Sequence, residues 1–189
     1  MNNSILIVDC GSSKVPLIES TLTEFNQDFT TIQMNSVTAE LALSHQGIIV
    51  SGAPILVTKT DPSPFLDQIR FLLDYPLPVL GICFGHQLLG MLHGARAFEC
   101  EPARSNLIVE KQAESILFQD ITDYTFNQDH CEAIDLPKGW KHLASSSICL
   151  NEAMEHPSKS LYGVQFHPET SNKNGAQLLK NFCKSCSTS

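Results

Sequence analysis

Short apolar runs alternate with segments of helical periodicity along the first half of the chain. Three such runs, at residues 4–10, 47–52 and 78–83, are rich in Val, Ile and Leu. Continuous runs of this kind are typical of strands buried on both faces of a parallel sheet. Between the second and third runs, apolar residues recur at the spacing of one helix face over positions 65–73. Strand, helix and strand in this order predict an α/β fold.

The pattern changes after Gly94, where the apolar pieces become shorter and are separated by Pro and Gly. They lie at residues 96–100, 105–110, 124–127 and 141–145. We expect this half to contain more antiparallel pairing than the first half. A last strand at 160–166 precedes an amphipathic segment at 175–184, which we expect to form a closing helix. Because no internal repeat or long linker interrupts the chain, we expect one domain over residues 1–189.

The composition is that of an ordinary globular protein. Of 189 residues, 42% are hydrophobic and 17% are charged, which suits a single core that needs no disulfide or metal. No run approaches the roughly 18 apolar residues that span a membrane, and the N-terminus lacks the basic region and cleavage site of a secretory signal. We therefore expect a cytoplasmic protein with no membrane partner. The net charge of -8 argues against nucleic acid as a direct ligand.

The seven cysteines are odd in number and irregular in spacing, which argues against a secreted disulfide framework. Cys183 and Cys186 have the C-x-x-C spacing, but they lie in a Ser-rich tail with no second pair and no clustered histidines. We expect a partly buried Cys183 and an exposed Cys186 with no redox or zinc role. We expect no metal ion or other cofactor elsewhere in the chain.

Cys83 is a candidate nucleophile because it stands between Gly81 and Gly85 at the end of a predicted strand, directly before a helical segment at 86–93. Strand, tight turn and helix form a nucleophile elbow, in which the glycines leave room for the turn. The free N–H groups at the helix N-terminus favour a thiolate over a thiol. The same residues also fit an inert buried cysteine at the end of a core strand.

A candidate base follows the last predicted strand, where the sequence reads His167-Pro168-Glu169. In an extended segment, residues two positions apart point to the same side, so His167 and Glu169 can face one site. A carboxylate that accepts from one ring nitrogen leaves the other nitrogen free to take the thiol proton. Taken alone, these three residues also fit a surface turn.

The two segments together resemble the paired signatures of class I glutamine amidotransferases. The signatures are Gly-Ile-Cys-Phe-Gly-His-Gln at 81–87 and Tyr-Gly-Val-Gln-Phe-His-Pro-Glu at 162–169. The resemblance implies a flavodoxin-like three-layer sandwich, with a mostly parallel central sheet and a smaller antiparallel portion in the C-terminal half. It also implies that L-glutamine forms a thioester on the cysteine and that the released ammonia passes to a synthetase domain or subunit.

The resemblance assigns roles to individual positions. Cys83 matches the nucleophile, His167 the base and Glu169 the acid that orients it. Backbone N–H groups of Phe84 and Ala53 match the oxyanion hole, and Gly52 and Gln87 match substrate-binding positions. The family usually has glycine where this chain has Ala53. If that turn requires a positive φ, the Cβ of alanine imposes strain and weakens the oxyanion hole.

Among subfamilies, the chain resembles most the glutaminase portion of GMP synthase, through residues 9–12, 143–146, 153–156 and 161–169. The segment that usually reads Ser-His-Gly-Asp is here Asp129-His130-Cys131-Glu132, and its first three residues are candidate substrate contacts. No Gly-rich phosphate loop is present, so a separate ATP-using subunit is the expected partner.

Three alternatives remain open from the sequence. The small subunit of anthranilate or aminodeoxychorismate synthase shares both motifs, but its usual Pro-Gly-Pro-Gly turn is absent at 51–54. A γ-glutamyl peptide hydrolase could use the same three side chains. A non-catalytic regulatory relative is disfavoured because the cysteine, histidine and glutamate are all present.

Overall fold

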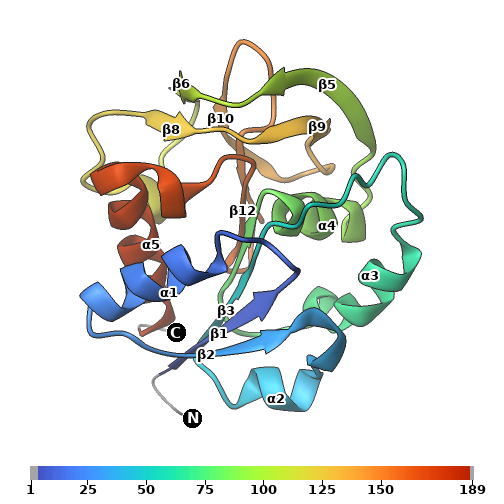
Figure 1. Ribbon diagram of the computed structural model, residues 1–189, viewed down its shortest axis with the longest axis vertical. Coiled ribbons are helices and arrows are strands. Elements are labelled where there is room, and N and C mark those ends of the chain that lie inside the picture. The colour runs from blue at the N-terminus through green and yellow to red at the C-terminus, as the bar shows by residue number, and fades with distance from the viewer. Residues whose placement is uncertain (1–3, 188–189) are drawn as a thin grey trace.

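The central layer of the protein is an eight-stranded sheet, seen in a computed structural model that describes residues 4–187 (Figure 1). Its strand order is β2-β1-β3-β4-β12-β11-β10-β7. The first five strands pair in parallel, and the last three join the sheet in antiparallel fashion. In sheet order the strands are Asp28–Gln33, Ser4–Asp9, Gly47–Val50, Val79–Ile82, Leu161–Val164, Ala153–Glu155, Lys141–Ser145 and Glu110–Lys111.

Helices cover both faces of this sheet and complete a three-layer sandwich. Alternate residues of β1 point to opposite faces, with Ile5 and Ile7 in one core and Leu6 and Val8 in the other. Helices α1 (Val15–Glu24) and α5 (Asn172–Cys186) cover the first face. The second face carries α2 (Ala39–Leu43), α3 (Ser63–Gln68) and α4 (Phe84–Leu92). Figure 1 shows α1 and α5 on the opposite side of the sheet from α3 and α4.

Two small antiparallel sheets lie above the carboxyl ends of the parallel strands, at the top of Figure 1. One pairs β5 (Ala97–Ala103) with β9 (His130–Ile134), and the other pairs β6 (Asn106–Ile108) with β8 (Thr125–Asn127). Short 3-10 turns η1 to η4 complete the described chain at Met34–Ser36, Arg70–Leu73, Ile116–Phe118 and Pro168–Thr170. The predicted fold class, with its parallel sheet and C-terminal antiparallel portion, is confirmed.

Two local predictions were wrong. The apolar spacing at 65–73 does not form one helix, because α3 ends at Gln68 and a 3-10 turn follows, which buries Ile69 and Leu72. Cys186 is not exposed, because it lies on the face of α5 that packs onto the sheet beneath Gly47. Burial raises the pKa of both Cys183 and Cys186 to about 12, so these thiols are protonated at neutral pH.

Residues 4–187 contain no helix with the length and hydrophobicity needed to cross a membrane. Within the same residues, no three His, Cys, Asp or Glu side chains gather as a metal site requires.

Candidate active site

Cys83 occupies a strained turn between strand β4 and helix α4. Its φ of 50° and ψ of -104° lie outside the regions that a residue with a side chain ordinarily adopts. The turn is held because the Cys83 N–H donates to the carbonyl of Val164, in the neighbouring strand β12, at 2.8 Å. Backbone strain of this kind concentrates at functional sites, where surrounding contacts maintain it.

The glycines on either side of Cys83 are required by close approach of the backbone. A Cβ at Gly81 would lie 2.5 Å from the carbonyl oxygen of Gly85. A Cβ at Gly85 would overlap the carbonyl group of Val50 in β3. Neither position can hold a larger residue unless α4 moves away from the sheet. The steric purpose predicted for these glycines is therefore confirmed.

His167 and Glu169 meet directly, with 2.7 Å between Nδ1 of the histidine and Oε1 of the glutamate. The geometry differs from the extended segment that we expected, because Glu169 lies in the 3-10 turn Pro168–Thr170. Only His167 is extended, with φ of -103° and ψ of 93°. Its N–H donates to the Asn127 carbonyl at 2.9 Å, and its own carbonyl accepts from the Ser171 hydroxyl at 2.6 Å. These two bonds hold the main chain of His167, and the contact with Glu169 orients its ring.

Burial and charge act in opposite directions on His167. Its side chain is 3% exposed, and desolvation disfavours the imidazolium. Hydrogen bonds and charge interactions with Cys83 and Glu169 outweigh that effect and raise the pKa of His167 to about 10. The imidazole is therefore protonated at neutral pH, and a protonated ring beside the sulfur favours a thiolate.

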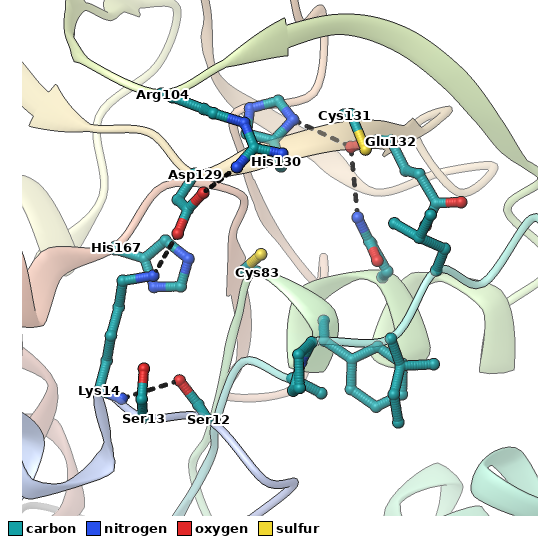
Figure 2. Close-up of a pocket in the computed structure, with 16 residues that line it drawn as sticks. Ser12, Ser13, Lys14, Cys83, Arg104, Asp129, His130, Cys131, Glu132 and His167 are labelled. Atoms are coloured by element: carbon teal, nitrogen blue, oxygen red, sulfur yellow. Dashed lines mark hydrogen bonds and ion pairs between the residues drawn. The ribbon is translucent and has the colours of Figure 1, made fainter.

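A pocket of about 320 Å³ opens above Cys83 (Figure 2). This volume is within the range of small-molecule sites. Figure 2 shows the Cys83 sulfur beside the His167 ring, with Asp129 and Arg104 nearer the small sheets. The sixteen lining residues are Ser12, Ser13, Lys14, Ala53, Pro54, Ile55, Leu56, Cys83, Phe84, Gln87, Arg104, Asp129, His130, Cys131, Glu132 and His167. Among the predicted site residues, only Gly52 and Glu169 are not in this lining.

Gly52 and Glu169 lie directly behind the lining. A Cβ on Gly52 would come within 3.1 Å of Cε1 of His167 and 3.7 Å of the Cβ of Cys83, so the glycine lets these two side chains approach. Ser51 fixes this turn, because its hydroxyl donates to the Gly52 carbonyl and accepts from the Cys10 N–H, each at 2.9 Å.

The two predicted oxyanion donors, the N–H groups of Phe84 and Ala53, have no hydrogen-bond partner within residues 4–187. The Gly85 N–H, by contrast, is taken by the Ser51 carbonyl at 3.2 Å. In the described chain, positive φ at residues other than glycine occurs at four positions that do not include Ala53. The strain considered for Ala53 is therefore absent, because this turn does not require a positive φ.

The candidate substrate-contact residues on and before β9 differ in whether their polar atoms already have partners within the protein. Asp129 pairs with Lys14 at 2.6 Å and lies 3.9 Å from Arg104. The bond from Lys14 holds the pKa of Asp129 below its usual range. Both ring nitrogens of His130 are engaged, Nδ1 by the Glu132 carbonyl at 3.0 Å and Nε2 by a Gln128 oxygen at 3.1 Å. Cys131 lines the same pocket as Cys83.

The side chain of Glu132 stabilises one wall of the pocket. Its carboxylate accepts the N–H of Val57 at 2.8 Å and the N–H of Thr58 at 2.9 Å, and also binds the Thr58 hydroxyl. These bonds hold the loop that follows Ala53 against β9.

Sequence reasoning missed Lys14, Arg104 and Gln165. Lys14 and Arg104 reach Asp129 from the start of α1 and the end of β5, so no local spacing connects them. Gln165 stands inside the second motif, and its Nε2 lies 3.6 Å from the Cys83 sulfur. Its place two residues before His167 was the signal available in the sequence.

Sequence and structure comparisons with known proteins agree with one another. A model of the family described as glutamine amidotransferase class-I matches residues 6–186. A glutamine-hydrolysing GMP synthase subunit of Methanococcus aeolicus is 36% identical over 96% of this chain and 97% of its own length. The glutamine-hydrolysing GMP synthase of Candida glabrata is 35% identical over 95% of this chain, which matches only 34% of that longer protein. The crystal structure of a putative GMP synthase subunit from Thermoplasma acidophilum has the same fold, with a TM-score of 0.89, 23% identity and coverage of 98% of this chain and 94% of the other.

Proposed function

Because the chain belongs to the class I glutamine amidotransferase family, we propose that it hydrolyses the side-chain amide of glutamine and supplies the ammonia to a separate synthetase subunit. The relationship inferred from the two motifs is confirmed by the family match. The GMP synthase subunit of Methanococcus aeolicus aligns with nearly the full length of this chain and of itself. We therefore take the ATP-using subunit of a GMP synthase as the partner and residues 1–189 as one amidotransferase domain.

In the proposed reaction, the Cys83 thiolate attacks the amide carbon of glutamine. The carbonyl electrons move to oxygen, and the N–H groups of Phe84 and Ala53 bind the resulting oxyanion. His167 gives its proton to the amide nitrogen, which leaves as ammonia when the C–N bond breaks. The product of this half-reaction is a glutamyl thioester on the sulfur.

In the second half-reaction, neutral His167 takes a proton from water, and the hydroxide attacks the thioester carbon. Collapse of the second tetrahedral intermediate breaks the C–S bond and releases glutamate, which restores the thiolate and the imidazolium. Glu169 does not exchange a proton in either step. It holds Nδ1–H and stabilises the charged ring, which leaves Nε2 for the sulfur and the substrate.

Substrate recognition is proposed for the walls of the same pocket. Asp129, Lys14 and Arg104 line the pocket with both signs of charge, which suits the ammonium and carboxylate groups of glutamine. Gln87, His130 and Cys131 line the pocket beside them. Gly52 contributes backbone at the base of the site.

The observation that carries this proposal is that Cys83 and His167 line one pocket, with Glu169 bonded to Nδ1 of His167 directly behind the lining. The test is release of glutamate from glutamine by the purified chain, both by itself and with the ATP-using subunit. We expect Cys83→Ala to abolish release and Cys183→Ala, at a cysteine on α5 outside the pocket lining, to retain it. Full activity of Cys83→Ala would overturn the proposal.

The partner is tested separately by glutamine-dependent formation of GMP from the unaminated nucleotide. We expect product only when both subunits and ATP are present. With added ammonia in place of glutamine, the isolated ATP-using subunit should form GMP. If glutamate is released but GMP formation from glutamine does not depend on this chain, the glutaminase assignment stands and the partner assignment is wrong.

A further inference from the structure

Gln165 contacts the reactive sulfur from inside the protein. Its side chain is completely buried directly after β12, and its Nε2 lies 3.6 Å from Sγ of Cys83. The preceding residue, Val164, accepts the Cys83 N–H at 2.8 Å. Two consecutive residues therefore hold the backbone and the sulfur of the same cysteine.

A chain of hydrogen bonds fixes which end of the Gln165 amide faces the sulfur. The backbone carbonyl of Glu132 can only accept, so the Gln87 group 3.3 Å away must be its NH₂. The same Gln87 nitrogen lies 3.2 Å from Gln165 and donates there to Oε1. With its oxygen occupied, Gln165 can present only its NH₂ to Cys83. The direction of the whole chain is thus set by one carbonyl in β9.

A donor aimed at sulfur distinguishes the two protonation states of Cys83. A hydrogen bond to a charged acceptor is stronger than one to a neutral acceptor, and burial increases the difference. Two titratable groups whose charges interact with this sulfur are His167 and Cys149. Burial raises the pKa of Cys149 above its usual range, so it is a neutral thiol. Gln165 therefore adds a second donor to the one that His167 supplies.

We propose that Gln165 is a further catalytic residue, whose side-chain N–H stabilises the Cys83 thiolate and fixes the direction of the sulfur. Gln87 and the β9 carbonyl act through it as positioning groups. The inference rests on the proposed role of Cys83 as nucleophile, and it links that atom to the strand that also carries Cys131 and Glu132.

The test is the pH dependence of Cys83 alkylation by iodoacetamide, followed by mass spectrometry of the modified peptide. Gln165→Met keeps an unbranched side chain and removes the donor. We expect the pH midpoint of alkylation to rise by about one unit, so that the rate well below the midpoint falls about tenfold. Gln165→Glu, which places a carboxylate beside the sulfur, should raise the midpoint further.

The matched control is Asn181→Leu, which removes another buried amide. Asn181 lies on α5 and donates to the carbonyls of Leu117 and Gln119, at 3.0 and 2.7 Å. We expect its loss to lower stability and leave the alkylation midpoint unchanged. If Gln165→Met folds and its alkylation midpoint equals that of the protein without substitutions, the proposal is overturned. The Gln165 amide would then contribute only to packing.

If neither Gln165 variant folds, NMR spectra of the protein without substitutions test the proposal. The side-chain NH₂ protons of Gln165 should shift with the same pH midpoint as Cys83 alkylation, and signals that do not titrate would refute the proposal. The alkylation assay requires no turnover of glutamine. A Cys83 that resists alkylation at all pH values would instead count against the proposed function.

Discussion

Replacing Glu169 by glutamine is the substitution that isolates charge from geometry at the proposed triad. The 2.7 Å contact from Oε1 to Nδ1 of His167 is buried, with the two side chains 3% and 1% exposed, so water does not screen it. The glutamine oxygen can still accept from Nδ1–H, which preserves the orientation of the ring. What is lost is the negative charge that helps to raise the pKa of His167.

A hydrogen bond to a charged group contributes about 1.5 to 3 kcal/mol. At about 1.4 kcal/mol for each factor of ten, Glu169→Gln should lower kcat/KM for glutamate release by about 10- to 150-fold. His167→Ala removes the proton carrier itself and should lower kcat by about 10⁴-fold or more. Glu114→Gln makes the same chemical change at a side chain that is 87% exposed, and it should have no effect.

The assay compares steady-state glutamate release by the three variants and the unmodified protein, each shown to be folded at the assay temperature. Two results would refute the reasoning. Equal and small losses in Glu169→Gln and His167→Ala would place the base elsewhere. An unchanged kcat/KM in Glu169→Gln would show that the carboxylate does not stabilise the imidazolium.

Other predictions concern the elbow, the oxyanion turn and the state of the base. Gly85→Ala should lower the free energy of unfolding by about 3 kcal/mol in urea titrations, because its Cβ meets backbone of β3 that cannot move aside. Gly139→Ala, at an open position with φ of 83°, should lower it by only about 1 to 2 kcal/mol, and equal losses would contradict the steric argument. Ala53→Gly should leave kcat unchanged, because Ala53 already lacks a positive φ; a clear gain would restore the strain hypothesis. The His167 ring should titrate in NMR spectra near pH 10 and remain protonated below that value. Cys83→Ala should move this midpoint downward. A midpoint near 6.5 in the unmodified protein would exclude an ion pair between His167 and Cys83.

The fold was predictable where burial leaves a simple pattern. Strands β1, β3, β4 and β12 are covered on both sides, and each appears in the sequence as an unbroken apolar run. Strand β2 was missed because it is an edge strand whose six residues are exposed or half-buried and include Asp, Thr and Gln. Its place is set by parallel pairing with β1, which carries no local signal.

The site residues were predictable where they lie close to one another in the sequence. Cys83 is marked by its flanking glycines, and His167 and Glu169 are two residues apart. Lys14 and Asp129 are 115 positions apart and meet only because the start of α1 and the loop before β9 reach the same sheet edge. The burial of Cys186 could not be predicted either. The Ser-rich sequence around this residue does not indicate that α5 extends to Cys186 and packs against the core.

The most direct test of the account is covalent capture of the nucleophile. A diazoketone analogue of glutamine should bind as the substrate does and alkylate the attacking thiolate. We expect mass spectrometry to find one adduct, on Cys83, with labelling slowed by excess glutamine and by His167→Ala. An adduct on Cys131 or Cys183, or no glutamine-protected adduct at all, would contradict the assignment of Cys83 as the nucleophile of a glutamine-hydrolysing enzyme.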